Sequence, residues 1–248
     1  MVEQQTVTGM VLSAMPIHDF DMRVLLLTRE KGKITAFAKG ARRQNSPFLA
    51  GCRPFSFGTF TLYAGKNSYG ITQIQISEYF MELTQDFFCA SYGFYFLEVA
   101  DYYGREGVDA KDSLNLLYAS FHALMKHKIP PKLIRAIYEL KSLAINGEYP
   151  DVFSCNHCGS KESPFYFDFQ HKIVFCKECV SNPKKYTVLN ATLVYALQFV
   201  ITQPMNQIYT FTLKEEYMKE FIQFVSRLFQ NTVHREFKSL EILETLES

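Results

Sequence analysis

The 248-residue sequence lacks tryptophan altogether, and its aromatic residues are 23 phenylalanines and 15 tyrosines. It also lacks any apolar run near the roughly 20 residues that cross a bilayer, so no membrane association is expected. The first five residues are polar and show no basic region followed by an apolar block, so we expect no signal peptide. These absences, together with cysteines that do not form a secreted pattern, predict a cytoplasmic protein.

Motifs for catalysis are missing as well. The sequence contains neither a Gly-x-x-x-x-Gly-Lys-Ser/Thr phosphate loop nor a Gly-x-Ser-x-Gly nucleophile turn. Asp19 and Asp21 leave a metal-dependent nuclease open as a hypothesis, but a solvated loop before a strand is the favoured interpretation. We therefore expect that the protein is not an enzyme.

Four of the six cysteines form two Cys-x-x-Cys pairs with 17 residues between the inner cysteines. Two such knuckles supply four thiolates in a tetrahedron, which predicts one structural Zn²⁺ ion. The predicted ligands are Cys155, Cys158, Cys176 and Cys179. Two disulfides or four free thiols are the alternatives. His157 is expected to be solvated, because four sulfurs already complete the coordination shell.

The segment between the knuckles favours this interpretation. Residues 164–169 and 172–175 are rich in Phe, Tyr, Ile and Val and are expected to form two strands that turn at Gln170-His171. The sequence therefore predicts a zinc ribbon over residues 151–185, projecting as an appendage. The remaining cysteines, Cys52 and Cys89, are isolated and are expected to be small buried apolar residues.

The first third of the chain consists of short runs with the period of two that strands require. They cover residues 6–13, 22–28, 34–38, 55–63 and 69–77. Five strands in fewer than eighty residues predict an N-terminal five-stranded OB-fold barrel over residues 1–79, with an SH3-like barrel as the alternative.

Beyond residue 79 the period changes to that of amphipathic helices. Helices are expected over 80–103, over 112–128 with Asp112 or Ser113 as N-cap, and from Pro130-Pro131 to Gly147. Later helices are expected after Asn190, after a capping box at Thr212, and over 235–246. The fold class is thus a multidomain α+β chain: a barrel followed by an all-α domain over 80–248, into which the zinc ribbon is inserted.

Charge is unevenly distributed along the chain. Residues 1–79 carry nine Lys or Arg against five acids, whereas residues 80–150 carry seven against nine. One stretch, residues 29–43, holds six cations and one acid. We favour the interpretation that it binds the phosphate backbone of a nucleic acid over the alternative of an ordinary solvated basic loop. The candidate DNA-binding residues are Arg29, Lys31, Lys33, Lys39, Arg42 and Arg43.

Several short sequence motifs occur in an order that is specific to one protein family. They are GMVL at 9–12, LTREKG at 27–32, KGARR at 39–43, IRAIYEL at 134–140, NGEYP at 146–150, CxxCG at 155–159 and REFKSL at 235–240. In these phrases the chain resembles the RecO family of bacterial recombination mediators over nearly its whole length.

The resemblance implies an OB-fold, a helical domain and a zinc ribbon in a bacterial, nucleoid-associated protein of the RecF pathway. It implies binding of single- and double-stranded DNA, annealing of complementary strands, and work with RecR in loading recombinase onto DNA coated with single-strand-binding protein. The acidic tail of that protein is expected to dock on the helical domain, with Lys132, Arg135 and Arg235 as candidate contacts. A zinc-ribbon adaptor that binds only proteins is the alternative function.

Overall fold

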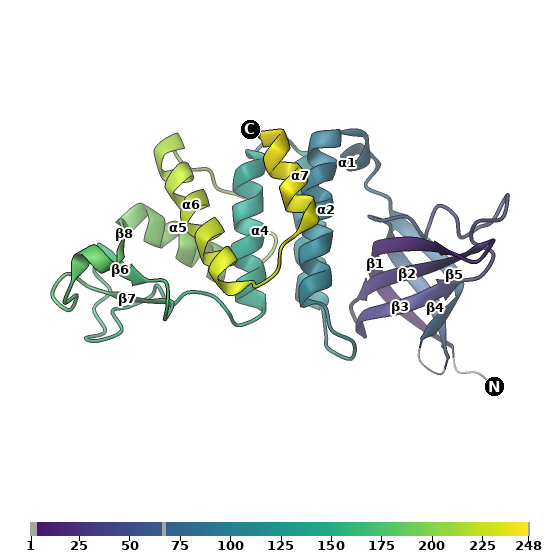
Figure 1. Ribbon diagram of the computed structural model, residues 1–248, viewed down its shortest axis with the longest axis horizontal. Coiled ribbons are helices and arrows are strands. Elements are labelled where there is room, and N and C mark those ends of the chain that lie inside the picture. Colours follow the sequence, from purple (N-terminus) through teal and green to yellow (C-terminus); the bar gives the residue numbers. More distant parts are fainter. Residues whose placement is uncertain (1–3, 66–67, 248) are drawn as a thin grey trace. The chain divides into compact units, whose positions relative to one another are not determined.

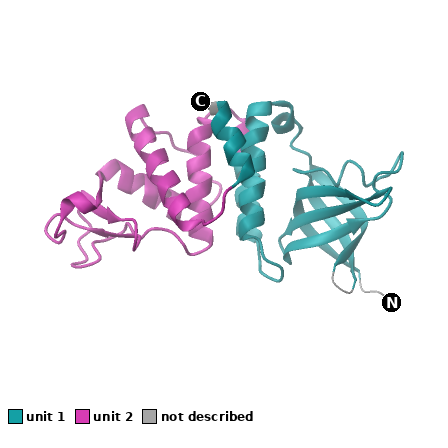
Figure 2. Cartoon of the chain, in the orientation of Figure 1, with its two compact units in different colours: residues 1–121, 237–248 teal, residues 122–236 magenta. Residues whose placement is uncertain are grey.

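A computed structural model describes residues 4–65 and 68–247 of the chain (Figure 1). The chain forms two compact units, one of Met1–Phe121 with Phe237–Ser248 and one of His122–Glu236 (Figure 2). Among the described residues, no helix combines the length and the apolar character that a membrane span requires.

Five strands in the first unit close into a barrel. They are β1 (Gln4–Ile17), β2 (Asp21–Thr28), β3 (Gly32–Ala38), β4 (Phe57–Ala64) and β5 (Tyr69–Glu78). The order around the barrel is β1-β2-β3-β5-β4, and the only parallel pair among these described strands is β3 with β5. This order and the parallel pair are those of an OB-fold, so the predicted five-stranded OB-fold is confirmed and the SH3-like alternative is not supported.

The alternating sequence of β3 illustrates why the barrel forms. Ile34 and Ala36 point into the core, while Lys33, Thr35 and Phe37 point outward. The turn between β2 and β3 is closed by the buried hydroxyl of Thr28, which donates to the Gly32 carbonyl at 2.9 Å and accepts from the Lys31 N–H at 3.1 Å. The turn therefore holds the two strands in a single register.

Among its described residues, the first unit also contains the helices α1 (Met81–Gln85), α2 (Phe87–Tyr103), α3 (Lys111–Met125), which runs past the boundary of the unit, and α7 (Lys238–Glu247). The predicted single helix over 80–103 is wrong, because the Asp86 carboxylate caps α2 by accepting from the N–H groups of Phe88 and Cys89. The expected N-cap of α3 is also wrong, since the helix already begins at Lys111. In α2, Glu98 accepts from the Ser239 N–H at 3.0 Å and so anchors the start of α7.

The second unit combines helices with a small sheet. Its helices are α4 (Pro131–Ile145), α5 (Ala191–Thr202) and α6 (Glu215–Thr232), and its strands are β6 (Phe165–Asp168), β7 (Ile173–Phe175) and β8 (Thr187–Leu189). Asn190 caps α5 as predicted, by accepting from the Leu193 N–H at 2.9 Å. The predicted capping box at Thr212 is wrong, because α6 begins at Glu215 with Lys214 as its N-cap, and no side chain caps it there.

The ribbon sheet has the order β7-β6-β8, so the two predicted strands are joined by a third, which the sequence analysis missed. Phe167 of β6 is fully buried, and its ring lies 4.9 Å from that of Phe224 on α6. The side-chain amide of Gln198 on α5 donates to the Val152 carbonyl at 2.8 Å. The ribbon is therefore packed into the second unit, and the expectation of a projecting appendage is wrong.

Candidate metal centre and nucleic-acid interface

The four cysteines of the paired motifs converge on one point. Their sulfur atoms all lie within 4.8 Å of one another, and the Cys158 and Cys176 sulfurs are 3.7 Å apart. Four Zn–S bonds of about 2.3 Å in a tetrahedron require sulfur–sulfur separations of about 3.8 Å. The cysteine cluster therefore has the donor set and the spacing that a tetrahedral metal ion needs.

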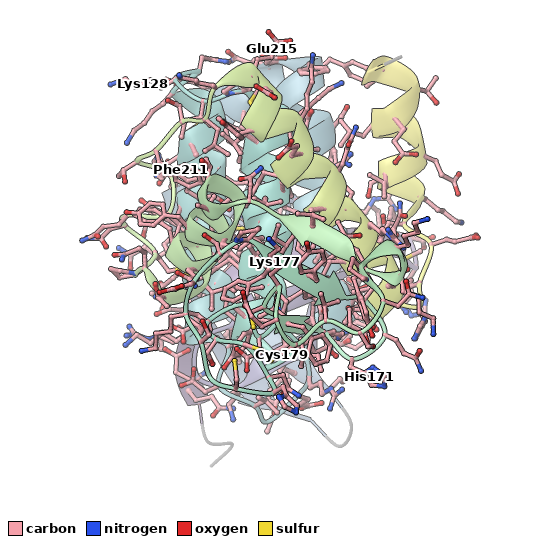
Figure 3. The ribbon with its side chains drawn as sticks, turned by 90° about the vertical axis from the view of Figure 1, so that its left-hand side faces the viewer. Lys128, His171, Lys177, Cys179, Phe211 and Glu215 are labelled. Carbon is pink, nitrogen blue, oxygen red and sulfur yellow. The ribbon has the colours of Figure 1, made fainter. Side chains whose placement is uncertain are left out.

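Local backbone turns place each pair of sulfurs. In the first knuckle, Gly159 has a φ of +75° and its N–H donates to the Cys155 carbonyl at 2.9 Å. In the second, which follows β7, the Cys179 N–H donates to the Cys176 carbonyl at 3.1 Å. Figure 3 views the chain from the ribbon side and labels Cys179, Lys177 and His171 there.

The proton affinities of the clustered thiols diverge. Burial raises the pKa of Cys155, but hydrogen bonds from the backbone at Cys158, Cys176 and His157 outweigh it and lower that pKa to about 6. Hydrogen bonds with the Cys158 and Cys176 side chains raise the pKa of Cys179 to about 12. The two pKa values shift in opposite directions, as expected where the charge of one sulfur disfavours ionisation of the next. Four thiolates at this spacing require a cation among them.

The two histidines of the ribbon lie outside the group of four sulfurs, and His157 is exposed as expected. His157 lies beside the cluster, with Nδ1 3.5 Å from the Cys179 sulfur. The His171 ring instead contacts the Asp168 carboxylate at 2.8 Å in the β6–β7 turn. Cys52 and Cys89 are buried elsewhere as expected, and burial is the main reason that the pKa of each rises to about 12.

The six predicted DNA-binding cations do not form one cluster. They divide between the two ends of the β2–β3 hairpin, because β3 separates Gly32 from Ala38 by about 20 Å. We call Arg29, Lys31 and Lys33 the turn-end group, and Lys39, Arg42 and Arg43 the loop-end group.

The turn-end group is partly engaged in contacts within the first unit. The Lys33 ammonium lies 2.8 Å from the Asp101 carboxylate of α2 and donates to the Asp101 carbonyl at 2.6 Å. The Lys31 ammonium lies over the ring of Tyr69, 5.6 Å from its centroid. Arg29 is exposed. Only part of this group is therefore directed to solvent.

The loop-end group is exposed and stands on a well-anchored loop. The Arg42 N–H donates to the Phe20 carbonyl at 2.8 Å, and the Gly40 N–H donates to the Asp21 carboxylate at 2.7 Å. The Arg43 guanidinium lies over the half-exposed ring of Phe20, 5.6 Å from its centroid. These contacts bring the β1–β2 and β3–β4 connections together and present cations beside an aromatic ring.

One further cation on this face had escaped the sequence analysis. Arg23 projects outward from β2 and has Met15 of β1 and Phe37 of β3 as its cross-strand neighbours. Its guanidinium contacts the Met15 sulfur at 3.1 Å. We call Arg23, Lys39, Arg42 and Arg43, with Phe20 and Phe37, the basic face of the barrel. A lone arginine in a strand gave no signal until the register was known.

Asp19 and Asp21 accept hydrogen bonds from the loop that carries the loop-end group. The Asp19 carbonyl accepts from the Arg42 side chain at 3.4 Å, and Asp21 holds Gly40. Within residues 4–65 and 68–247, neither aspartate joins a group of three or more possible metal ligands. This arrangement favours the loop interpretation over the nuclease.

The three predicted tail contacts are not equivalent. Arg135 is only 8% exposed, with its Nε 3.3 Å from a Glu139 oxygen and its Nη2 3.3 Å from the Ser226 hydroxyl. Lys132 and Arg235 are exposed. Arg135 is thus placed inside the second unit, where it joins α4 to α6.

A groove of about 520 Å³ lies in the second unit between the ribbon and α5 and α6. Phe169, Val188, Leu193 and Phe224 form its apolar walls. Arg227 also lines it, and the guanidinium lies 4.0 Å from the centroid of the Phe169 ring. Arg227 lies three residues after Phe224, so the two side chains share one face of α6. This spacing could have identified Arg227 in the sequence as a cation beside the apolar residues of the helix.

Comparison with known protein families accounts for almost the whole chain. Residues 1–80 match the family description "Recombination protein O N terminal", and residues 84–241 match "Recombination protein O C terminal". The chain belongs to the RecO family. The N-terminal RecO region coincides with the barrel, and the C-terminal RecO region contains the helices and the cysteine cluster.

Individual RecO proteins are similar to the chain along most of their length. A DNA repair protein RecO from Alkaliphilus metalliredigens is 31% identical over 201 residues, which is 81% of this chain and 82% of that protein. The one from Acetivibrio thermocellus is 26% identical over 241 residues, covering 97% and 96% respectively. The Bacillus subtilis RecO is 26% identical over 246 residues, covering 97% and 94%.

Proposed function

We propose that the protein is a DNA repair and recombination mediator that binds single- and double-stranded DNA and anneals complementary strands. With RecR, it helps to load recombinase onto DNA coated with single-strand-binding protein in the RecF pathway of the bacterial cytoplasm and nucleoid. The observation that carries this proposal is the basic face, an exposed set of cations interleaved with aromatic rings on an OB-fold barrel.

The chemistry of the basic face suits a nucleic-acid backbone. Lys39, Arg42 and Arg43 can neutralise phosphates without reading base sequence, and counterion release makes such binding strongly salt-dependent. Phe20 and Phe37 offer surfaces on which unpaired bases can stack, which contributes about 1–3 kcal/mol per base. The part of the turn-end group that faces solvent adds cations at the other end of the hairpin. Residues 1–79 thus act as the DNA-binding domain.

In this proposal the cysteine cluster has a structural role. Cys155, Cys158, Cys176 and Cys179 hold one Zn²⁺ whose coordination shell is complete, so the ion orders the ribbon over residues 151–185. Binding energy of about 10 kcal/mol in small structural sites appears as folding energy. The ribbon in turn forms one wall of the groove beside α6 within the helical domain, residues 80–248.

The same groove is the proposed site for the acidic tail of single-strand-binding protein. Its apolar walls suit the apolar side chains of the tail, and Arg227 supplies a cation for a carboxylate. The one acid that lines the groove among the described residues, Glu220, accepts a hydrogen bond from the Asn190 side-chain amide at 2.8 Å. Of the earlier candidates, Lys132 and Arg235 can steer the acidic tail from outside the groove. Arg227→Ala should weaken binding of a tail peptide, measured by fluorescence anisotropy, whereas Lys184→Ala should not.

The alternative function, a zinc-ribbon adaptor that binds only proteins, is separated from the proposal by direct binding measurements. A labelled single-stranded oligonucleotide is titrated with the protein at low salt, and a duplex of the same sequence is titrated in parallel. The mediator should bind both with little sequence preference. Absence of binding to either oligonucleotide under these conditions would favour the adaptor.

A further inference from the structure

Helix α2 lies over part of the outer surface of the barrel. One face of the helix, with spacings of three and four residues, carries Phe94, Leu97, Glu98 and Asp101. The Lys33 ammonium on β3 lies 2.8 Å from the Asp101 carboxylate and so joins this face of the helix to the β2–β3 hairpin. The helix therefore occupies the Lys33 end of the hairpin, whereas the cations of the basic face stay exposed at the other end.

A cavity of about 230 Å³ lies where α2 meets β1 and β2. Leu25 from β2 and Phe94 and Leu97 from α2 line it with apolar side chains. Sites for drug-sized ligands typically measure about 300–1,000 Å³, so this cavity suits a smaller ligand. Its size and its apolar walls are those of a site for one small planar ring system.

The register of the barrel places this cavity directly beside the basic face. Ser13 of β1, which also lines the cavity, pairs with Leu25 of β2. Two residues further along the strands, Met15 pairs with Arg23 of the basic face. Side chains two residues apart on a strand point to the same face and lie about 7 Å apart. A DNA strand whose phosphates contact Arg23 therefore passes the exposed Ser13 at the mouth of the cavity.

The charged groups that line the cavity are acceptors of hydrogen bonds. They are the carboxylates of Glu98 and Asp101, and the Ser239 N–H fixes Glu98 by donating to it at 3.0 Å. A carboxylate accepts several hydrogen bonds, so these groups can also receive an N–H from a ligand. Phosphate is disfavoured here by its like charge. Every unpaired base, in contrast, offers at least one N–H at its pairing edge, which in a duplex is already bonded to the other strand.

We propose that this cavity receives one unpaired base of a single strand that is bound on the basic face. The base lies against Leu25, Phe94 and Leu97, and an N–H of its pairing edge donates to a carboxylate of α2. A duplex cannot supply such a base without breaking a base pair, so the cavity makes the barrel favour single strands whatever their sequence. This proposal rests on the DNA-binding function proposed for the barrel and adds the feature that separates single-stranded from duplex DNA.

Filling the mouth of the cavity tests the proposal. Ser13→Phe adds a ring there at an exposed position, and Ser77→Phe, at an exposed position of β5, is the matched control. The full chain is titrated into a labelled single strand and into a duplex of the same sequence, with fluorescence anisotropy as the signal. Ser13→Phe should bind the single strand about fivefold or more weakly, through the loss of one stacked base, and the duplex as tightly as the wild type. Ser13→Ala keeps the cavity open and should bind both as the wild type does.

Photocrosslinking locates the base directly. A single strand that carries 5-iodouracil should crosslink to the peptide that contains Phe94, identified by mass spectrometry, and Ser13→Phe should lose this crosslink. The cavity proposal alone is overturned if the wild type binds both DNAs but no crosslink reaches that peptide. It is also overturned if Ser13→Phe weakens single-strand binding no more than Ser77→Phe does, or weakens duplex binding equally. If the wild type binds neither DNA, the DNA-binding function fails and this proposal fails with it.

Discussion

Replacing Arg42 and Arg43 together with Ala probes the basic face most directly. The change removes two of the three cations of the loop-end group, and both side chains are exposed. The backbone contact from the Arg42 N–H to the Phe20 carbonyl does not depend on either side chain. The barrel should therefore stay folded, which circular dichroism can check, while DNA affinity falls for all sequences alike.

The size of the effect follows from counterion release. Each lost phosphate contact removes about 0.7 from the log–log salt slope for single-stranded DNA, so two contacts remove about 1.4. Between about 50 and about 200 mM salt, the variant should lose about sevenfold less affinity than the wild type. For duplex DNA, at about 0.9 per contact, the corresponding difference is about twelvefold.

The assay is a salt titration of oligonucleotide binding by fluorescence anisotropy. Lys126→Ala with Lys128→Ala is the matched control, because it removes two exposed cations from the other unit. That control should keep the wild-type slope. An unchanged affinity and slope for the Arg42 and Arg43 variant would refute the reasoning. The DNA site would then have to be sought among other cations, first the ribbon lysines Lys172, Lys177, Lys184 and Lys185.

Three further predictions concern the ribbon. Cys176→Ser should lose the metal and loosen the ribbon while the barrel stays folded; elemental analysis that still finds one zinc per chain would contradict this. Phe167→Ala removes a fully buried ring and should lower the free energy of unfolding of the second unit by about 3–5 kcal/mol, measured with denaturant. For Asp168, burial opposes ionisation, but hydrogen bonds from His171 and Gln170 outweigh it and lower the pKa. Its stabilising effect is therefore present above the ordinary Asp pKa of about 3.9 and is lost as the pH falls through the lowered value. Asp168→Asn should remove the contribution of this carboxylate to the loss of thermal stability at acid pH. A variant whose unfolding temperature depends on pH as that of the wild type does would contradict this role of Asp168.

The barrel and the cysteine cluster could be predicted from the sequence because their signals are local and periodic. Strands such as β3 alternate residue by residue, and each Cys-x-x-Cys pair fixes two ligands within one turn. The convergence of the two pairs followed from the hairpin between them. The strands and ligand pairs themselves were therefore visible in the pattern, whereas the closure of the barrel, through β1 with β4 and β3 with β5, joins distant segments and was inferred only from the number of strands.

The arrangement of charge could not be predicted in the same way. Residues 29–43 form one basic stretch in the sequence, yet the length of β3 places its cations at opposite ends of a hairpin. Lys33 is paired with Asp101, 68 residues away, and Arg23 joins the basic face only through strand register. Contacts between residues so far apart leave no local pattern in the sequence. The burial of Arg135 between α4 and α6 could not be predicted for the same reason.

Two helix ends were predicted wrongly for a related reason. Thr212 and Glu215 have the spacing of a capping box, but α6 begins at Glu215, so this residue lies in the first helical position and not in the third that the box requires. Asp86 lies within an apolar stretch whose pattern predicts one continuous helix, but its carboxylate is the N-cap of a new helix, α2. The sequence shows which side chains can cap a helix, whereas tertiary packing decides which of them do.

The most direct test of the proposed function is annealing of complementary oligonucleotides coated with single-strand-binding protein. The wild type should accelerate duplex formation on coated strands, and the Arg42→Ala and Arg43→Ala variant should be slower in proportion to its weaker DNA binding. Arg227→Ala should be impaired only on coated strands. If the wild type binds DNA but leaves the annealing rate of bare and coated strands unchanged, the mediator function proposed for this chain is contradicted.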